Sequence, residues 1–211
     1  MIVKVCGITQ EEQAREISSF GATHIGVIHF PKSPRHIDIS RIKSIKSSIP
    51  DTVKLVAVVV NPDKKDVLKL LEVADVIQFH GEEPLEFLKD FPKEKIFKAF
   101  RIKDFSDVEK IEPFSEEGYT ILIDAFHREA YGGTGKQIDP FLAKEIIKRY
   151  KNIILSGGLS PENVENLIKN LRPYGVDASS KLEVKPGVKD LAKTKEFVQR
   201  ARKAFSGELV E

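Results

Sequence analysis

Short apolar runs recur along the whole chain, separated by longer segments that are rich in polar residues. The runs are dominated by Val and Ile and contain few charged residues, which is typical of parallel strands buried on both faces. We expect strands at residues 2–8, 24–30, 53–60, 75–80, 95–100, 119–125, 152–157 and 174–179.

Amphipathic segments with helical periodicity lie between these runs. The clearest cover 66–71 and 161–168, and Ser160-Pro161 supplies the second with a cap followed by proline in the first turn. Each strand with its helix takes about 25 residues, which suits a βαβ crossover. Eight such units close a barrel, whereas a doubly wound open sheet would need fewer strands or a longer chain. The sequence therefore predicts an α/β fold, a (β/α)8 TIM barrel forming a single domain over 1–211.

Composition narrows the classes of function. The 211 residues are 41% hydrophobic and 31% charged, and 34 basic residues nearly balance 32 acidic ones, giving a net charge of +2. Nucleic-acid binding would need a basic excess gathered on one face, whereas the lysine pairs here are short and dispersed. We therefore expect no nucleic-acid partner. High charge with one Cys and one Met is compatible with a thermophilic source.

The same composition bears on the compartment. A single cysteine excludes an internal disulfide, so nothing indicates an oxidising environment. The apolar run at the start is too short for a signal peptide, and no stretch approaches the roughly 20 apolar residues of a membrane helix. We expect a cytoplasmic protein that has no membrane partner.

The unusual chemistry of the sequence gathers where the predicted strands end. In a barrel of this kind the active site lies on the loops at the C-terminal ends of the strands. The corresponding windows are 6–9, 30–35, 80–82, 124–135, 156–158 and 177–180. This coincidence is the main argument from the residues that the chain is an enzyme.

Paired glycines and serines follow the seventh and eighth predicted strands. Gly157 and Gly158 let the backbone approach an anion closely, and Ser179 and Ser180 add hydroxyl and N–H donors. The loops after strands 7 and 8 of this fold frequently bind phosphate. A glycine pair alone is usually only a turn, but the two loops together predict a phosphorylated small-molecule substrate. A third glycine group, which includes Gly133, lacks the spacing of a P-loop.

Cys6 and Asp124 end the first and sixth predicted strands. Since side chains alternate along a strand, Cys6 shares a face with Lys4, and Asp124 shares one with Leu122. If these faces point inward, both groups lie at the barrel mouth. A lone Cys is more often a small buried hydrophobe, and an Asp is often a cap or an ion-pair partner. Together they favour an acid and a base for isomerisation by ring opening and proton abstraction beside a carbon–nitrogen double bond.

A thiol is only slightly ionised at neutral pH, so a base at Cys6 needs a neighbouring cation. Arg35, His80 and Lys4 are the candidates. Arg35 follows the second strand in a proline-marked loop and suits a carboxylate partner. His80 has either a direct chemical role or a hydrogen-bonding or packing role. Lys4, if it points inward, needs a counter-charge, and we expect Asp177 to supply it.

With these segments in place, the sequence resembles the phosphoribosylanthranilate isomerase family over nearly its whole length. No single motif is decisive, but their order and spacing are specific. The motifs that carry the resemblance are 4–9, 31–35, 58–61, 78–82, Asp124, 132–136, 156–159, 177–180 and 186–190.

The resemblance implies an Amadori rearrangement of N-(5-phosphoribosyl)anthranilate to 1-(2-carboxyphenylamino)-1-deoxyribulose 5-phosphate, without a metal or organic cofactor. It assigns Asp124 as the acid that protonates the furanose oxygen and Cys6 as the base that removes the C2 proton. It further implies that the chain is a monomer or a homodimer. The residues that it places around the substrate are Arg35 at the anthranilate carboxylate, Gly157, Gly158, Ser179 and Ser180 at the phosphate, and His80, Gly133 and Asp177 elsewhere.

The sequence departs from the family at a few positions. Val27 and His29 stand where phenylalanines are common, and Lys181 replaces a glycine that would tolerate a positive φ. The segment 138–140 replaces an aromatic-Asp-Trp pattern. None of these changes removes a predicted acid, base or phosphate contact.

Other functions remain open on the residues alone. The histidine-pathway isomerase shares the barrel, but that family has an aspartate ending each half, whereas Cys6 ends the first strand here. A catalytically silent phosphate-binding protein would have no need of both Cys6 and Asp124. A thiol redox protein would need a second cysteine.

Overall fold

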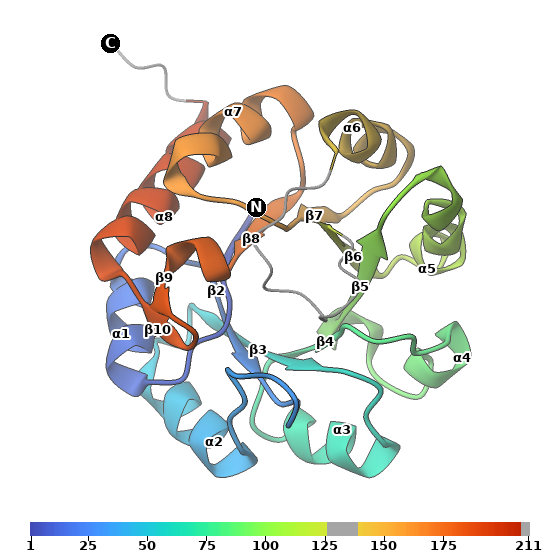
Figure 1. Cartoon of the computed structure of the whole chain (residues 1–211). Coiled ribbons are helices and arrows are strands. Elements are labelled where there is room, and N and C mark those ends of the chain that lie inside the picture. The colour runs from blue at the N-terminus through green and yellow to red at the C-terminus, as the bar shows by residue number, and fades with distance from the viewer. Residues whose placement is uncertain (126–138, 208–211) are drawn as a thin grey trace.

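The computed structural model describes residues 1–125 and 139–207. Eight parallel strands form a closed barrel, in which each strand pairs with its neighbours in the chain and the last pairs with the first (Figure 1). The predicted TIM barrel is therefore confirmed. The strands are β1 (Ile2–Val5), β2 (His24–Ile28), β3 (Lys54–Val59), β4 (Val76–Phe79), β5 (Ile96–Ile102), β6 (Thr120–Ala125), β7 (Ile153–Leu155) and β8 (Gly175–Ala178).

Helices surround the barrel on its outer side (Figure 1). Two of them, α4 and α5, are only four and five residues long, and 3-10 turns accompany them. The α-helices are α1 (Glu11–Ser19), α2 (Ile39–Ser48), α3 (Lys64–Leu71), α4 (Leu85–Leu88), α5 (Glu112–Glu116), α6 (Pro140–Arg149), α7 (Pro161–Leu171) and α8 (Leu191–Ser206). The 3-10 turns are η1 (Lys93–Lys95), η2 (Phe105–Asp107), η3 (Glu109–Ile111) and η4 (Ser180–Leu182).

Aspartate side chains begin several of these helices. In α2, for example, the Asp38 carboxylate accepts a hydrogen bond from the Arg41 N–H at 2.8 Å. Such a cap satisfies an N–H group that the first turn leaves without an intrahelical acceptor. The same arrangement occurs at Asp63 of α3, Asp139 of α6 and Asp190 of α8.

Two apolar clusters fill the molecule. The larger lies between strands and helices and includes Val3, Val5 and Ile123. The smaller contains the inward side chains Ile2, Val56, Val76, Phe97, Ala99, Leu122 and Ile154. Ile2 has the parity of Lys4 and Cys6, and Leu122 has that of Asp124, so the predicted inward orientation of these residues is confirmed.

Lys4 and Asp177 are partners in the register between β1 and β8, and their side chains form an ion pair inside the barrel. Lys4 Nζ lies 2.9 Å from Asp177 Oδ1, and the lysine side chain is fully buried. Burial disfavours the charge on Lys4, but the attraction and hydrogen bonds of Asp177 and Cys6 together outweigh it and raise the pKa of the lysine. The expected partner of Lys4 is therefore confirmed.

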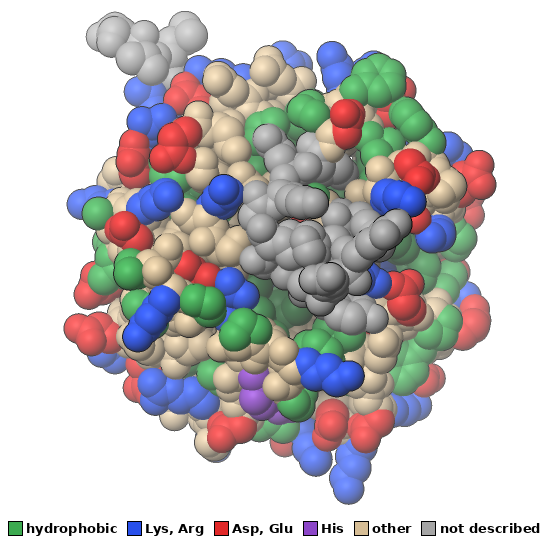
Figure 2. All heavy atoms as spheres, in the orientation of Figure 1, with side chains coloured by type: hydrophobic (Ala, Val, Ile, Leu, Met, Phe, Trp, Pro, Cys, Tyr) green, Lys and Arg blue, Asp and Glu red, His purple; other side chains and the backbone are tan. Residues whose placement is uncertain are grey.

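Acidic and basic side chains are interspersed over the face drawn in Figure 2. Many form exposed ion pairs, such as Lys169 with Glu165 at 2.6 Å. Exposed pairs of this kind contribute little stability. Within 1–125 and 139–207, none of the helices combines the length and the apolar character that crossing a bilayer requires.

Replacing one partner of the buried pair, in Lys4→Met or Asp177→Asn, leaves the other charge buried and uncompensated. We expect each variant to lose about 3–5 kcal/mol of unfolding free energy, measured by urea denaturation. The double variant Lys4→Met/Asp177→Leu should lose much less than the sum of two single losses. Lys169→Met, which removes an exposed pair, is the control and should lose about 1 kcal/mol or less. Losses as small as the control's in both single variants would show that the pair does not hold the barrel together.

Candidate active site

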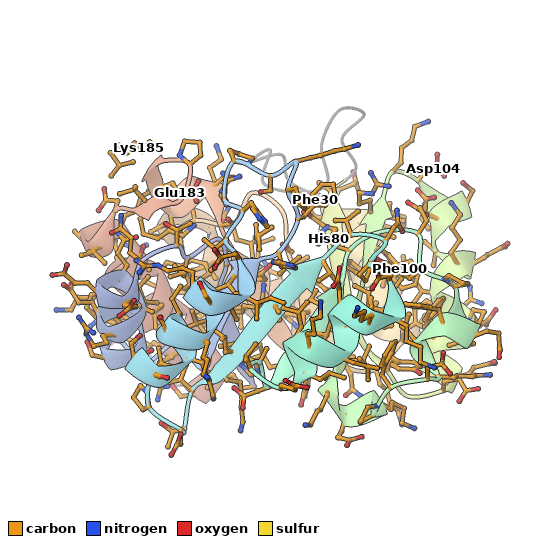
Figure 3. All side chains as sticks on the ribbon, turned by 90° about the horizontal axis from the view of Figure 1, so that it is seen from below. Phe30, His80, Phe100, Asp104, Glu183 and Lys185 are labelled. Atoms are coloured by element: carbon orange, nitrogen blue, oxygen red, sulfur yellow. The ribbon has the colours of Figure 1, made fainter. Side chains whose placement is uncertain are left out.

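A cavity of about 510 Å³ opens at the C-terminal ends of the barrel strands. Figure 3 places Phe30, His80 and Glu183 toward this same end of the barrel. Gly133 lies outside the described residues. All the other predicted site residues line the cavity, namely Cys6, Arg35, His80, Asp124, Gly157, Gly158, Asp177, Ser179 and Ser180. The structure thus brings together residues from six different strand ends.

Cys6 follows β1 directly and is held by its backbone. Its N–H donates to the Ala178 carbonyl at 2.9 Å, and its own carbonyl accepts from Ser179 Oγ at 3.0 Å. Burial raises the pKa of the Cys6 thiol, and the positive charges of Lys4 and Lys189 offset this only in part. Lys4 was among the expected cations, whereas Lys189 was not.

Gly26 on the neighbouring strand β2 makes room for the thiol. A Cβ atom at position 26 would lie 2.7 Å from Cys6 Sγ and 3.0 Å from Cys6 Cα. Any larger residue would displace the sulfur or the strand, so glycine is required here by close approach.

Asp124 and His80 face each other across the mouth of the barrel. Asp124 is the penultimate residue of β6 and is 6% exposed, and its Oδ1 accepts a hydrogen bond from the Ala125 N–H at 2.9 Å. Its Oδ2 lies 3.6 Å from Nε2 of His80, which follows β4. The other ring nitrogen of His80, Nδ1, lies 3.1 Å from the amide nitrogen Nε2 of Gln78.

Arg35 is held by a carboxylate from a distant part of the chain. Its Nε and Nη2 donate to the two oxygens of Glu183 at 2.8 and 2.6 Å. Glu183 also accepts from the buried Lys189 at 2.8 Å. Although burial disfavours the charge of Glu183, the hydrogen bond from Arg35 and the charge of Lys189 hold the pKa of this carboxyl below its ordinary value. Within residues 1–125 and 139–207, two of the five guanidinium donors are therefore used, and three have no acceptor there and suit a ligand.

A short hairpin carries this carboxylate. Its strands β9 (Glu183–Lys185) and β10 (Val188–Lys189) lie antiparallel and follow η4. Sequence reasoning missed the roles of Glu183 and Lys189. The dipeptide Pro186-Gly187 is a turn signal that predicts such a hairpin, but it does not indicate which cation the hairpin contacts.

The loop after β4 is held by a buried network. Lys98 Nζ donates to Glu83 Oε2 at 2.8 Å and to the Gly81 carbonyl at 2.7 Å. Glu83 Oε1 in turn accepts from the N–H groups of Asn61 and Gly81 at 2.8 and 3.1 Å. These bonds fix the backbone immediately after His80, and sequence reasoning did not anticipate them.

The predicted phosphate loops have the backbone that an anion site needs. Gly157 and Gly158 have φ angles of 91° and 66°, which favour glycine. The Asn163 amide donates to the Gly158 carbonyl at 2.9 Å and accepts from the Ser160 N–H, so it ties this turn to the start of α7. After β8, η4 begins at Ser180, and Ser180 and Lys181 line the same cavity.

Lys181, which replaces a glycine of the family, lies within η4 and is not among the described residues with a positive φ. The backbone there accepts a lysine without strain. Asp177 lines the cavity, but its Oδ1 pairs with Lys4, and its Oδ2 lies 3.4 Å from Ser156 Oγ. A contact between Asp177 and substrate remains a prediction.

Comparison with known proteins agrees with this geometry. The model of the family "N-(5'phosphoribosyl)anthranilate (PRA) isomerase" matches residues 3–200. An N-(5'-phosphoribosyl)anthranilate isomerase of Sulfurihydrogenibium sp. is 57% identical over 198 residues, which cover 94% of this chain and 97% of the relative. The corresponding protein of Aquifex aeolicus is 43% identical over 202 residues, covering 95% and 98%.

Solved structures give the same result. Phosphoribosyl anthranilate isomerase from Thermotoga maritima superposes with a TM-score of 0.88 at 34% identity, covering 96% of this chain and 99% of that one. A further structure of the Thermotoga maritima protein concerns monomers derived from the dimeric form. The chain therefore belongs to the phosphoribosylanthranilate isomerase family, the isomerases of tryptophan biosynthesis.

Proposed function

We propose that the chain converts N-(5-phosphoribosyl)anthranilate into 1-(2-carboxyphenylamino)-1-deoxyribulose 5-phosphate by general acid and base catalysis. The observation that carries this proposal is that Cys6 and Asp124 line one cavity together with the glycine and serine loops after β7 and β8. A phosphorylated sugar held at those loops has its reacting carbons over the barrel mouth. In support, a related phosphoribosyl anthranilate isomerase, 33% identical with a TM-score of 0.85, is known in complex with reduced 1-(o-carboxyphenylamino)-1-deoxyribulose 5-phosphate.

The reaction begins at Asp124. Its carboxylic acid transfers a proton to the furanose oxygen as the bond from C1 to that oxygen breaks, and the nitrogen lone pair forms a protonated Schiff base. The Cys6 thiolate then removes the proton from C2, and the electrons of that C–H bond neutralise the iminium nitrogen. The resulting enol tautomerises to the ketone as C1 gains a proton and the C2 hydroxyl loses one. Cys6 then loses its proton and Asp124 regains one, which returns both groups to their starting states. Atoms and charge balance without a cofactor or an external oxidant.

The charges around the cavity fit these steps. Lys4 and Lys189 favour the Cys6 thiolate, which burial otherwise disfavours. The free donors of Arg35 suit the anthranilate carboxylate, and the Glu183 pair prevents the guanidinium from turning away. The phosphate is held by the backbone of Gly157, Gly158, Ser179 and Ser180.

Removing either group should stop the reaction. We expect Cys6→Ser and Asp124→Asn each to lower kcat at least about 100-fold, because a positioned acid or base contributes that much or more. Turnover is followed by the loss of anthranilate-type fluorescence, and urea denaturation checks that both variants are folded. Turnover near the parent's in either variant would remove that residue from the mechanism. A folded parent chain that does not turn the compound over would refute the proposed substrate.

The Cys6 thiol should ionise only at high pH, because burial raises its pKa. An acid with a raised pKa keeps its proton up to a higher pH, so the fraction of Cys6 present as thiolate grows only as the solution becomes alkaline. We expect the rate of iodoacetamide alkylation to keep rising above about pH 9. Since the chain has one cysteine, mass spectrometry reports this site alone. A rate that levels off below about pH 8 would contradict the predicted direction.

Arg35→Lys tests the carboxylate contact. Lysine keeps the charge but loses the planar fork, so we expect KM to rise about 10–100-fold with a smaller change in kcat. Arg41→Lys, at an exposed arginine of α2, is the matched control and should leave KM unchanged. A fall in kcat at unchanged KM would instead place Arg35 in the chemical step.

A further inference from the structure

Two buried polar atoms in the active-site cavity lack a hydrogen-bond partner within the described part of the chain. They are Gln78 Oε1 and His80 Nε2. Gln78 is 1% exposed and His80 is 8% exposed, and both residues line the active-site cavity. Buried polar atoms are rarely left unpaired, and exceptions in a cavity point to function. Neither atom has a role in the mechanism described so far.

We propose that Gln78 is a positioning residue that fixes the tautomer of His80 and thereby assists Asp124. Its amide holds the neutral imidazole with the proton on Nε2, so that this N–H faces Asp124. The inference rests on the proposed function, because it concerns the step in which Asp124 gives up a proton.

The geometry carries the assignment. Gln78 lies on β4, and His80 follows the strand two residues further along, so both side chains point inward to the cavity. The amide nitrogen of Gln78 lies 3.1 Å from His80 Nδ1. An amide nitrogen bears only donors, so Nδ1 must accept, and the single proton of a neutral ring then sits on Nε2. A flipped amide would accept from Nδ1–H and turn the bare lone pair of Nε2 toward the Asp124 carboxylate.

The position of Asp124 explains why this tautomer matters. Its Oδ1 already accepts the Ala125 N–H, so Oδ2 is the oxygen that carries the transferable proton. His80 Nε2 lies 3.6 Å from Oδ2, a distance that a small movement closes to a hydrogen bond. As the O–H bond of Asp124 breaks and the proton moves to the furanose oxygen, negative charge appears on Oδ2. An N–H aimed at that oxygen stabilises the charge when it forms and speeds ring opening.

Two substitutions of Gln78 separate this role from simple packing. Gln78→Leu removes the amide, so both tautomers of His80 should become populated. Gln78→Glu, of nearly the same shape, offers only acceptors when ionised and should shift the ring to the Nδ1–H form. We expect kcat to fall about 10–100-fold in both variants, the usual effect of losing a group that orients another, with KM changed less than about threefold.

The tautomer is read directly from long-range ¹H–¹⁵N spectra of histidine-labelled protein. The chain has five histidines, and the signals of His80 are identified by their loss in His80→Asn. Gln13→Leu removes another buried glutamine, which bonds the Lys189 backbone, and serves as the matched control. It should leave the His80 spectrum as in the parent.

The outcomes separate the two proposals. Three results together support the inference: the parent shows the Nε2–H form, Gln78→Leu and Gln78→Glu lose it, and kcat falls in both variants. An unchanged His80 spectrum in both variants overturns it, as does a changed spectrum with unchanged kcat. Absence of turnover by the folded parent overturns the proposed function itself, while the tautomer remains measurable.

Discussion

Closure of the barrel between β1 and β8 brings Lys4 directly opposite Asp177, and the site is built above this buried pair. In a closed barrel every second side chain points inward, so inward positions must be apolar, paired or exposed to a ligand. At one end of the barrel the inward side chains, such as Ile2 and Leu122, are apolar. In its middle Lys4 and Asp177 are charged and paired. Cys6 therefore reaches the cavity on top of a charged but compensated layer.

The same rule organises the loops around the cavity. Every buried charge described there has a partner: Arg35 and Lys189 share Glu183, and Lys98 binds Glu83. Such pairs bring little net stability after desolvation, but breaking one is costly, so they hold loops in a single arrangement. Arg35 is thereby kept at one side of the cavity and the backbone after His80 at another. Among the described residues that line the cavity, two buried polar atoms have no hydrogen-bond partner, Gln78 Oε1 and His80 Nε2, and the second lies 3.6 Å from the proposed acid.

The proposed acid and the proposed base occupy different electrostatic surroundings. Cys6 is buried among strand ends, where burial raises the pKa of its thiol and the charges of Lys4 and Lys189 partly offset this rise. Asp124 meets a histidine and a backbone N–H. Groups that must hold opposite protonation states at the start of a reaction need different neighbours, and the barrel supplies them from separate strands.

The local sequence pattern was sufficient to predict the barrel and several residues of its site. The period-two alternation of the strands placed Cys6 on one face with Lys4 and Asp124 on one face with Leu122, and the structure showed that these faces point inward. The glycine pair at 157–158 predicted the turn before α7. The ion pair of Arg35 with Glu183 could not be read in this way, since 148 residues separate the two. Their contact depends on where the hairpin folds over the barrel mouth, and the pairing of Gln78 with His80 depends on side-chain rotation. Tertiary packing decides both, because sequence periodicity fixes the face of a strand but not the partner across a cavity.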